Sequence, residues 1–504
     1  MDESPVGLVD RSRSLEELEA RRFDVLVVGG GIIGAGIACE AARAGLAVAL
    51  VDRADFGSQT SSASSKLVHG GLRYLRLGDV RLVREAHRER RALMRVVAPH
   101  LVRRISFLMP LYRGGAYRPL TVQAALWLYS TLAHERLGGL VRPERARKSV
   151  PHLRLEGLRG CGLYSDSWTN DSRLCLANVR AAAEAGATVV NYAEVCALRA
   201  VGGRVAGAEV TDRLEGGELA LEARTVINAT GPWVDRLRLL EDPAAAPSSR
   251  LSKGAHVLLP LGRPWSAALT VPHDKVRVSF AVPWEGMLLL GTTDALYEGD
   301  PENVAATDED VRVILAEAAA ALEPEILQPQ AVCATFAGLR VLPGVGSDTT
   351  TARRETLFFR GPKGMLSVAG GKLTTYRRIA LDALAALRPE LGIHRLDEAP
   401  RPLPGAACLR ESSLRIARGY PELEAEVRTH LAHLYGSLAE EVLALADEDP
   451  GLLRRLHPNA PELAAQAVYA RRYEWACRPE DILRRRTTLA LRGLALPDPQ
   501  LLVS

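Results

Sequence analysis

Several features of secreted, metal-binding and membrane-spanning proteins are missing from this sequence. Its seven cysteines are odd in number and include no Cys-x-x-Cys pair, so we expect free thiols and neither a disulfide framework nor a metal or iron–sulfur site. No uncharged run reaches the roughly 18 residues that a transmembrane helix needs. The first residues, Met1 to Ser4, are acidic and lack the apolar segment of a secretory signal, which favours a cytoplasmic protein.

Lysine is scarce as well, and the charges nearly balance. The 504 residues carry 64 basic and 60 acidic side chains, and only six of the basic ones are lysines. A net charge of +4 over this length is mild, and no recognition module accompanies it, so we expect no nucleic-acid partner. Hydrophobic residues at 47% and charged residues at 25% indicate a globular protein of about two to four domains.

A dinucleotide-binding motif stands near the start of the chain. Residues 23–28 form an apolar run typical of a buried strand, which leads into the glycine-rich turn GGGIIG at 29–34. A helix and a second strand at 47–51 follow, and Asp52 closes the unit. In such a unit the glycines allow close approach to a pyrophosphate, the helix N-terminus binds the phosphates, and the acid bonds a ribose hydroxyl.

The segment TSSASSKLVHGGLRY at 60–74 favours FAD over NAD. Its hydroxyl groups and glycines follow the second strand directly, where they can wrap a second phosphate and ribityl stretch. An NAD site more often continues into another strand–helix pair. The same segment leaves His69 and Arg73 near the reactive ring.

Beyond this unit the pattern changes between helices and short strands. Helices are expected at 81–97, 119–133, 173–189 and 307–322. The stretch 251–295 alternates apolar runs with turns, as an antiparallel sheet does. After residue 404 the pattern is almost purely helical, which indicates a separate C-terminal domain.

Motifs over most of the chain resemble those of the FAD-dependent glycerol-3-phosphate dehydrogenases, which belong to the D-amino-acid-oxidase-like flavoproteins. The matches are GGGIIGAGIA at 29–38, SSASSKLVHGGLRYL at 61–75, INATGPW at 227–233, KGAHVLLP at 253–260, GTTD at 291–294, GLRVL at 338–342 and GGKLTTYR at 370–377. In the tail, YGS at 435–437 and RRRTTLAL at 484–491 resemble the family's C-terminal helical domain.

The resemblance implies an α/β (α+β) fold of three parts. These are a Rossmann-like FAD-binding domain of the D-amino-acid-oxidase/glutathione-reductase type, an antiparallel-sheet substrate domain and a C-terminal helical domain. We expect the FAD-binding domain at residues 20–100, 155–240 and 355–395, the substrate domain at 101–154 and 241–354, and the helical domain at 400–504.

The resemblance also implies FAD as the cofactor, held by residues of the matched motifs. The expected cofactor-binding residues are Gly29, Gly31, Ile32, Ile33, Gly34, Asp52, Thr60, Ser61, Ser62, Ser65, Lys66, Leu67, His69, Gly70, Gly71, Ala229, Thr230, Gly231, Trp233, Gly338, Arg340, Gly370, Gly371, Lys372, Leu373 and Thr374.

The implied reaction is the oxidation of sn-glycerol 3-phosphate to dihydroxyacetone phosphate by hydride transfer to flavin N5. A phosphorylated polyol needs a cationic cradle, which the planar fork of arginine suits, and a base for the hydroxyl proton. The expected substrate-binding residues are Arg73, Tyr74, His256, Thr293, Arg340, Arg353 and Lys372. Arg353 departs from the family pattern, because Arg354 follows it where an acid is usual.

Two histidines compete for the role of base, since a neutral imidazole accepts a proton near neutral pH. His69 lies in the flavin-side segment and is favoured, while His256 lies in a strand of the substrate sheet and is the alternative. Arg340 and Lys372 are the other residues expected to act in catalysis.

The resemblance implies a quinone at a membrane surface as the electron acceptor. Between residues 67 and 118 twelve arginines stand against three acids, which favours contact with anionic lipid, and the apolar run 119–133 follows. We therefore expect peripheral attachment to the inner face of the cytoplasmic membrane, and a homodimer is compatible with the family. The alternatives are a glycerol-3-phosphate oxidase that uses O₂ and a related FAD-dependent amino-acid or hydroxy-acid oxidase.

Overall fold

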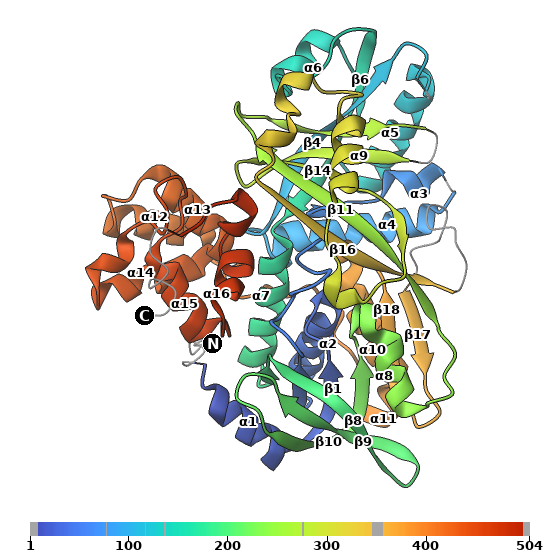
Figure 1. Ribbon diagram of the computed structural model, residues 1–504, viewed down its shortest axis with the longest axis vertical. Helices are drawn as coiled ribbons and strands as arrows, with labels where there is room; N and C mark the ends of the chain where they lie inside the picture. Colours follow the sequence, from blue (N-terminus) through green and yellow to red (C-terminus); the bar gives the residue numbers. More distant parts are fainter. Residues whose placement is uncertain are drawn as a thin grey trace.

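The computed structural model describes residues 9–76, 78–115, 117–135, 138–274, 277–344 and 356–496, apart from the side chains of Arg73 and Arg76. Within these ranges the strands form one sheet of eight and one of ten. The two sheets follow each other along the long axis of the molecule, and the C-terminal helices lie to one side (Figure 1). This is the mixed α/β fold with a helical C-terminal domain that the sequence predicts.

The eight-stranded sheet is built on parallel strands in the order β18-β10-β1-β2-β7, with β17 antiparallel at one edge and the hairpin β8–β9 joined to β10. Its strands are β1 (Arg22–Val28), β2 (Val48–Val51), β7 (Thr188–Val190), β8 (Ala193–Val201), β9 (Arg204–Asp212), β10 (Glu218–Asn228), β17 (Thr356–Arg360) and β18 (Leu366–Gly370). The helices of this part, which we call the cofactor domain after the expectation above, are α1 (Arg11–Ala20), α2 (Ile32–Arg43), α7 (Asp171–Glu184), α8 (Val234–Glu241), α10 (Tyr376–Ala386) and α11 (Arg388–Leu391).

Alternate residues of the central strand β1 face two separate cores. Val25 and Val27 pack with α2, α7 and α10, while Leu26 and Val28 pack with the hairpin β8–β9. Because α2 is rich in small residues, it approaches α10 closely: a Cβ at Gly36 would stand 2.9 Å from the ring of Tyr376. The N-terminus of α2 is thereby fixed at the end of the sheet.

The ten-stranded sheet has the order β15-β11-β14-β13-β12-β4-β6-β3, with β16 on β11 and β5 on β6. Its strands are β3 (Leu67–Val68), β4 (Val102–Tyr112), β5 (Gly139–Val141), β6 (Leu158–Thr169), β11 (Ser249–Pro260), β12 (Ala267–Pro272), β13 (Val278–Trp284), β14 (Met287–Gly291), β15 (Ala295–Tyr297) and β16 (Ala334–Pro343). The helices of this part, which we call the substrate domain after the expectation above, are α3 (Leu72–Arg76), α4 (Val80–Ala92), α5 (Pro119–Ala133), α6 (Pro143–Ser149) and α9 (Asp308–Ala318). Most neighbouring strands are antiparallel, but β12 and β4 are parallel.

Two strands lie in a different domain from the one expected. β6 pairs with β4 along its length and β3 pairs with β6, so both belong to the substrate sheet, whereas the expected segments 155–240 and 20–100 assign them to the cofactor domain. The helices α3 and α4, also within 20–100, lie with this sheet as well. β6 is followed at once by α7, so the chain passes from one domain to the other at Asn170 and Asp171. This crossing places Asp171 at the junction of the two sheets.

The C-terminal domain consists of short helices packed around their own apolar core. They are α12 (Leu409–Gly419), α13 (Ala425–Tyr435), α14 (Ala439–Ala444), α15 (Ala464–Tyr473) and α16 (Pro479–Asp481). Of the helices in the described ranges, none combines the length and the apolar character that crossing a bilayer demands.

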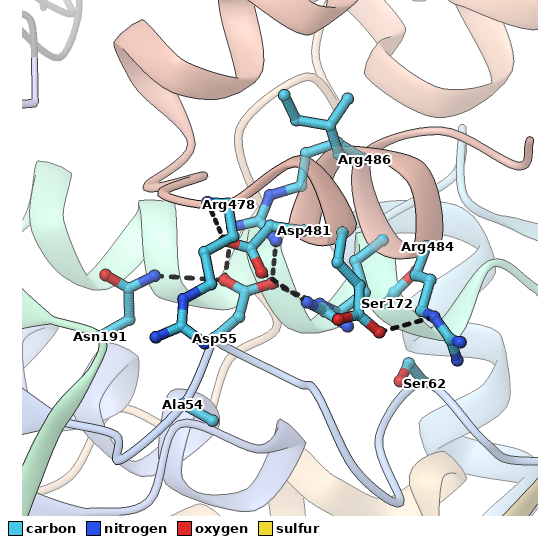
Figure 2. A network of polar contacts seen from close by, with 12 residues as sticks. Ala54, Asp55, Ser62, Ser172, Asn191, Arg478, Asp481, Arg484 and Arg486 are labelled. Atoms are coloured by element: carbon cyan, nitrogen blue, oxygen red, sulfur yellow. Dashed lines mark hydrogen bonds and ion pairs between the residues drawn. The ribbon is translucent and has the colours of Figure 1, made fainter. Parts of the chain in front are cut away.

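A buried cluster of charges joins this domain to the cofactor domain. Asp55, which follows β2 and is 1% exposed, accepts hydrogen bonds from the guanidinium groups of Arg485 and Arg486 and from the amide of Asn191. Arg485 also donates to Asp481 at 2.7 Å. Figure 2 shows Asp55 with Asn191, Asp481 and Arg486 around it. Burial alone would raise the pKa of Asp55, but the charges of the two arginines hold it below its usual value, so the carboxylate stays ionised.

Replacing Asp55 by Ala leaves two buried guanidinium groups without their counter-charge. We expect the free energy of unfolding to fall by roughly 3–5 kcal/mol, measured by thermal or denaturant unfolding. Glu309→Ala removes an exposed partner of Arg312 and, as the matched control, should leave the melting temperature unchanged. A melting temperature of Asp55→Ala equal to that of the parent would show that this cluster does not hold the two domains together.

Candidate active site

One large cavity, of about 1490 Å³, runs between the two sheets. It extends from the carboxyl ends of β1 and β2, along β11 and β16, to helices α3 and α5. Ligands of open α/β sheets bind outside the carboxyl ends of the parallel strands. The volume exceeds the roughly 300–1,000 Å³ of an ordinary ligand pocket, as an extended cofactor together with a substrate requires.

Glycines at the end of β1 form one wall of the cavity. Gly29 has a φ of +105°, and a Cβ there would stand 2.6 Å from the carbonyl oxygen of Ala229. A Cβ at Gly34 would overlap the carbonyl oxygen of Gly29, so α2 can begin this close to the strand only with glycine. The first turn of α2 lines the cavity, and the positive end of its dipole lies there.

Asp52 lines the cavity at the end of β2. Its two carboxylate oxygens accept the backbone N–H groups of Gly30 at 2.6 Å and of Ala54 at 2.8 Å. Burial raises its pKa to about 6, while these two hydrogen bonds act in the opposite direction. A carboxylate oxygen has a second lone pair, which leaves acceptor capacity for a ribose hydroxyl.

The loop between β18 and α10 supplies the facing wall, with Gly370, Gly371 and Lys372 lining the cavity. The Thr374 hydroxyl accepts the N–H of His69 at 3.1 Å and lies 3.3 Å from the carbonyl oxygen of the same residue. The start of α10 is thereby tied to the segment that carries His69. The Nζ of Lys372 lies 3.6 Å from the ring centroid of Tyr74, within cation–π range.

Arg340 lines the cavity from β16 and is held by the loop after β14. Its guanidinium donates to the Thr292 hydroxyl at 2.9 Å and to the Thr293 carbonyl at 3.3 Å, and it lies 3.7 Å from the carboxylate of Asp294. Gly254 on β11 leaves the space that the guanidinium occupies, because a Cβ at this position would stand 2.8 Å from Cζ of Arg340.

His256 is buried on β11 beside this arginine. Its ring stacks on Phe336 with centroids 4.8 Å apart, and its Nε2 lies 2.9 Å from the Ser65 hydroxyl. Burial, with the charges of Arg340 and Lys66, holds the pKa of His256 well below its usual value. The imidazole is therefore neutral, and two cations oppose its protonation.

The side chain of Lys66, an expected cofactor ligand, forms a buried ion pair and does not line the cavity. Its side chain is 1% exposed and donates at 2.6 Å both to the Asp171 carboxylate and to the Ser62 carbonyl. This ion pair joins the hydroxyl-rich segment to the first residue of α7, where the chain passes between the domains. Lys66 supports the cavity wall from behind instead of lining it.

Most of the expected site residues line this one cavity, although they come from segments far apart in the sequence. Those that do are Gly29, Gly31, Ile32, Ile33, Asp52, Thr60, Ser61, Ser65, Leu67, His69, Gly71, Tyr74, Ala229, Thr230, Gly231, Trp233, His256, Gly338, Arg340, Gly370, Gly371, Lys372, Leu373 and Thr374.

Five expected residues do not line the cavity but lie behind its wall: Gly34, Ser62, Lys66, Gly70 and Thr293. Gly70 lets the chain pass over His87, whose ring a Cβ would overlap, and the hydroxyl of Thr293 accepts the N–H of Ala255 at 2.9 Å. The side chain of Arg73 and the whole of Arg353 lie outside the described part of the structure.

Asp166 and Arg478 are two charged residues among the lining residues that stand outside the motifs. Asp166 on β6 is buried and accepts hydrogen bonds from Arg90, from the Tyr129 hydroxyl and from the N–H of Gly70, and burial raises its pKa to about 6. The acid within the strand sequence LYSDSWT is a signal from which sequence reasoning could have found Asp166. Arg478 belongs to the C-terminal domain, and nothing local in the sequence places it at the cavity.

The groups around the cavity fit FAD. The glycine turn and the N-terminus of α2 would hold the pyrophosphate, and Asp52 would bond the adenosine ribose. The backbone of Gly370 to Thr374 would face the polar edge of the flavin, where a helix N-terminus stabilises negative charge.

The comparisons with known proteins agree with this fit. A family model described as FAD dependent oxidoreductase matches residues 24–377, and one described as the C-terminal domain of alpha-glycerophosphate oxidase matches residues 399–495. Fold and site thus define an FAD-dependent oxidoreductase, and the expected cofactor is confirmed.

Similar proteins show to which family of FAD-dependent oxidoreductases the chain belongs. The chain is 36% identical to a glycerol-3-phosphate dehydrogenase of Mycobacterium leprae, over 98% of this chain and 86% of the relative. It is 35% identical to glycerol-3-phosphate dehydrogenase 2 of Mycobacterium tuberculosis, over 96% and 84%. A solved structure of the Bacillus halodurans glycerol-3-phosphate dehydrogenase, complexed with FAD, superposes with a TM-score of 0.79 at 30% identity, covering 96% of this chain and 89% of that one. The chain belongs to the glycerol-3-phosphate dehydrogenase family.

Gly254→Ala tests whether the position of the Arg340 guanidinium matters, without removing its charge. The added methyl group displaces the guanidinium, so we expect the KM for the substrate to rise by about tenfold, which corresponds to ~1.4 kcal/mol, with FAD still bound. Gly419→Ala is the matched control, since a Cβ at Gly419 meets nothing within 4 Å. An unchanged KM in Gly254→Ala would mean that Arg340 can move without affecting the substrate.

Proposed function

We propose that the chain oxidises sn-glycerol 3-phosphate to dihydroxyacetone phosphate and that a quinone is its electron acceptor. The observation that carries the proposal is the shared position of His69, Arg340 and Lys372 around one cavity, which brings a base and two cations of different shape to one small-molecule site. A substrate that ends in a single carboxylate needs one cation only. A phosphate monoester can bind both cations.

Arg340 and Lys372 would bind the phosphate. The guanidinium of Arg340 is oriented by Thr292 and Thr293, so little side-chain freedom is lost when its fork meets phosphate oxygens. Lys372 offers a compact charge from the opposite wall, above the ring of Tyr74. Holding the phosphate between the two walls fixes C2 of the substrate in the cavity, and this positioning lowers the barrier.

His69 is the base in this proposal, and it takes the proton of the C2 hydroxyl. His256 is less suited to the role, because Arg340 and Lys66 oppose its protonation. His256 instead forms a hydrogen bond with the Ser65 hydroxyl, in the part of the cavity wall that also carries Arg340. Bound FAD supplies the acceptor for the hydride that leaves C2.

A quinone acceptor is supported by the apolar arm of the cavity. This arm is lined by Leu72, Leu75, Phe107, Met109, Val122, Leu126, Leu128, Tyr164 and Phe280. It reaches α5, on whose outer side Leu120 is 83%, Trp127 53% and Leu128 47% exposed. An apolar tail of a quinone would find in this arm both a lining and an entrance at the surface.

Attachment to the inner face of the cytoplasmic membrane is part of the proposal. α4 packs on α5 and exposes Arg81, Arg84 and Arg88, which share one face of the helix. Basic residues beside exposed apolar ones suit an anionic lipid surface, each contributing roughly 1 kcal/mol. The match of residues 399–495 to an oxidase domain makes O₂ the second candidate acceptor.

Anaerobic addition of glycerol 3-phosphate to the purified yellow protein tests the reaction. We expect the oxidised flavin band to bleach, and we expect Arg340→Ala to need a far higher substrate concentration, since it loses the phosphate fork. A quinone or air admitted afterwards then identifies the acceptor. Arg263→Ala, a matched change outside the cavity, should behave as the parent. A protein that holds FAD and stays yellow would refute the substrate, and amino acids and hydroxy acids would be tried next.

Trp127→Glu tests the membrane surface. A charge on the outer side of α5 should weaken pelleting with phosphatidylglycerol vesicles by about tenfold, because burial of the tryptophan ring is lost. Activity with quinone in those vesicles should fall, while activity with a soluble dye stays the same. Leu414→Glu, at a residue 49% exposed on α12, is the control. Equal pelleting of both variants and the parent would exclude α5 from the contact.

A further inference from the structure

The cavity continues past Asp52, away from the glycine turn. With the pyrophosphate at the glycine turn and the ribose at Asp52, the adenine of FAD is carried into this end. The wall here comes from the loop after β2, from the start of β8 and from the C-terminal domain. The lining residues here include Arg53, Ala54, Tyr192, Glu194, Arg213 and Arg478.

Arg478 differs from the other two arginines in this wall. Arg53 is paired with Glu302 and Arg213 lies 3.4 Å from Glu194. The guanidinium of Arg478 has no carboxylate within ion-pair distance among the described residues, and it lies over the ring of Tyr192, with Cζ 4.6 Å from the centroid. A guanidinium held in this way presents a flat cationic face to an aromatic ligand.

The place of Arg478 is fixed from both domains. Its backbone N–H donates to Asp481 at 2.9 Å, and the hydroxyl of Tyr192 donates to the other oxygen of the same carboxylate at 2.7 Å. Arg485 links Asp481 to Asp55, three residues after the ribose-binding acid. In Figure 2 the side chain of Arg478 extends from this cluster toward the loop of Ala54. The contacts thus set the distance between Arg478 and the ribose site.

We propose that Arg478 closes the adenine end of the FAD site, which makes the C-terminal domain part of the cofactor-binding site. Its guanidinium stacks on the adenine ring, with Tyr192 behind it. This role rests on the FAD site of the family and is independent of the substrate and acceptor proposed above.

The test is the affinity of the FAD-depleted protein for FAD and for FMN, which lacks the adenylate. For Arg478→Ala we expect the Kd of FAD, followed by flavin fluorescence, to rise by about tenfold, or ~1.4 kcal/mol. The Kd of FMN, and the rise in melting temperature that saturating FMN gives, should equal those of the parent. Arg478→Lys keeps the charge but not the flat face, so its Kd for FAD should lie between those of the parent and of Arg478→Ala.

Arg484→Ala is the matched control, because Arg484 lies on the same segment, is 58% exposed and pairs with Glu480 at 2.8 Å. Its affinity for FAD should not change. An unchanged FAD affinity in Arg478→Ala would overturn the proposal, and so would an equal loss for FAD and FMN, which would indicate a general loosening. Bleaching of the reloaded variant by glycerol 3-phosphate is scored separately, so that failure of the adenine contact and failure of the substrate assignment are told apart.

Discussion

The close approach of α2 to the end of β1 is the constraint on which the site depends. A side chain at Gly34 would strike the backbone of Gly29, so the helix begins where it does only because both positions lack a Cβ. That start brings the positive end of α2 to the cavity and leaves Asp52, on the next strand, beside it. The larger sheet forms the other side of the cavity, where the paired strands β11 and β16 contribute His256 and Arg340.

Buried charges connect the parts that surround this space. Lys66 binds Asp171 where the chain changes domain, Arg90 binds Asp166 behind the segment of His69, and Arg486 binds Asp55 in the loop after β2. Such pairs add little net stability, because removing the ions from water costs about as much as their attraction returns. Each becomes costly when one partner is missing, so together they define how the domains fit.

Sequence reasoning reached the parts of the site that depend on local chemistry. The glycines around residue 31, the acid Asp52 and the motif of Lys372 each have a role that neighbouring residues reveal, and the cavity brings them together. Sequence reasoning failed where the interacting residues are far apart in the sequence. Lys66 stands within a cofactor motif, yet Asp171 takes its charge; β6 pairs with β4 across the expected boundary; and Arg478 reaches the cavity only through the packing of the C-terminal domain. No local pattern reports a contact of that kind.

The bond between Asp55 and Arg486 spans 431 positions of the chain, which has a consequence for how the protein is made. During synthesis the loop after β2 leaves the ribosome long before its partner exists, and contacts of such high sequence separation form late. A nascent chain that already contains the glycine turn still lacks β16, the loop of Lys372 and the wall at Arg478. A chain that ends before its last helices therefore lacks one wall of the cavity, and the arginine partners of Asp55 are missing from it as well.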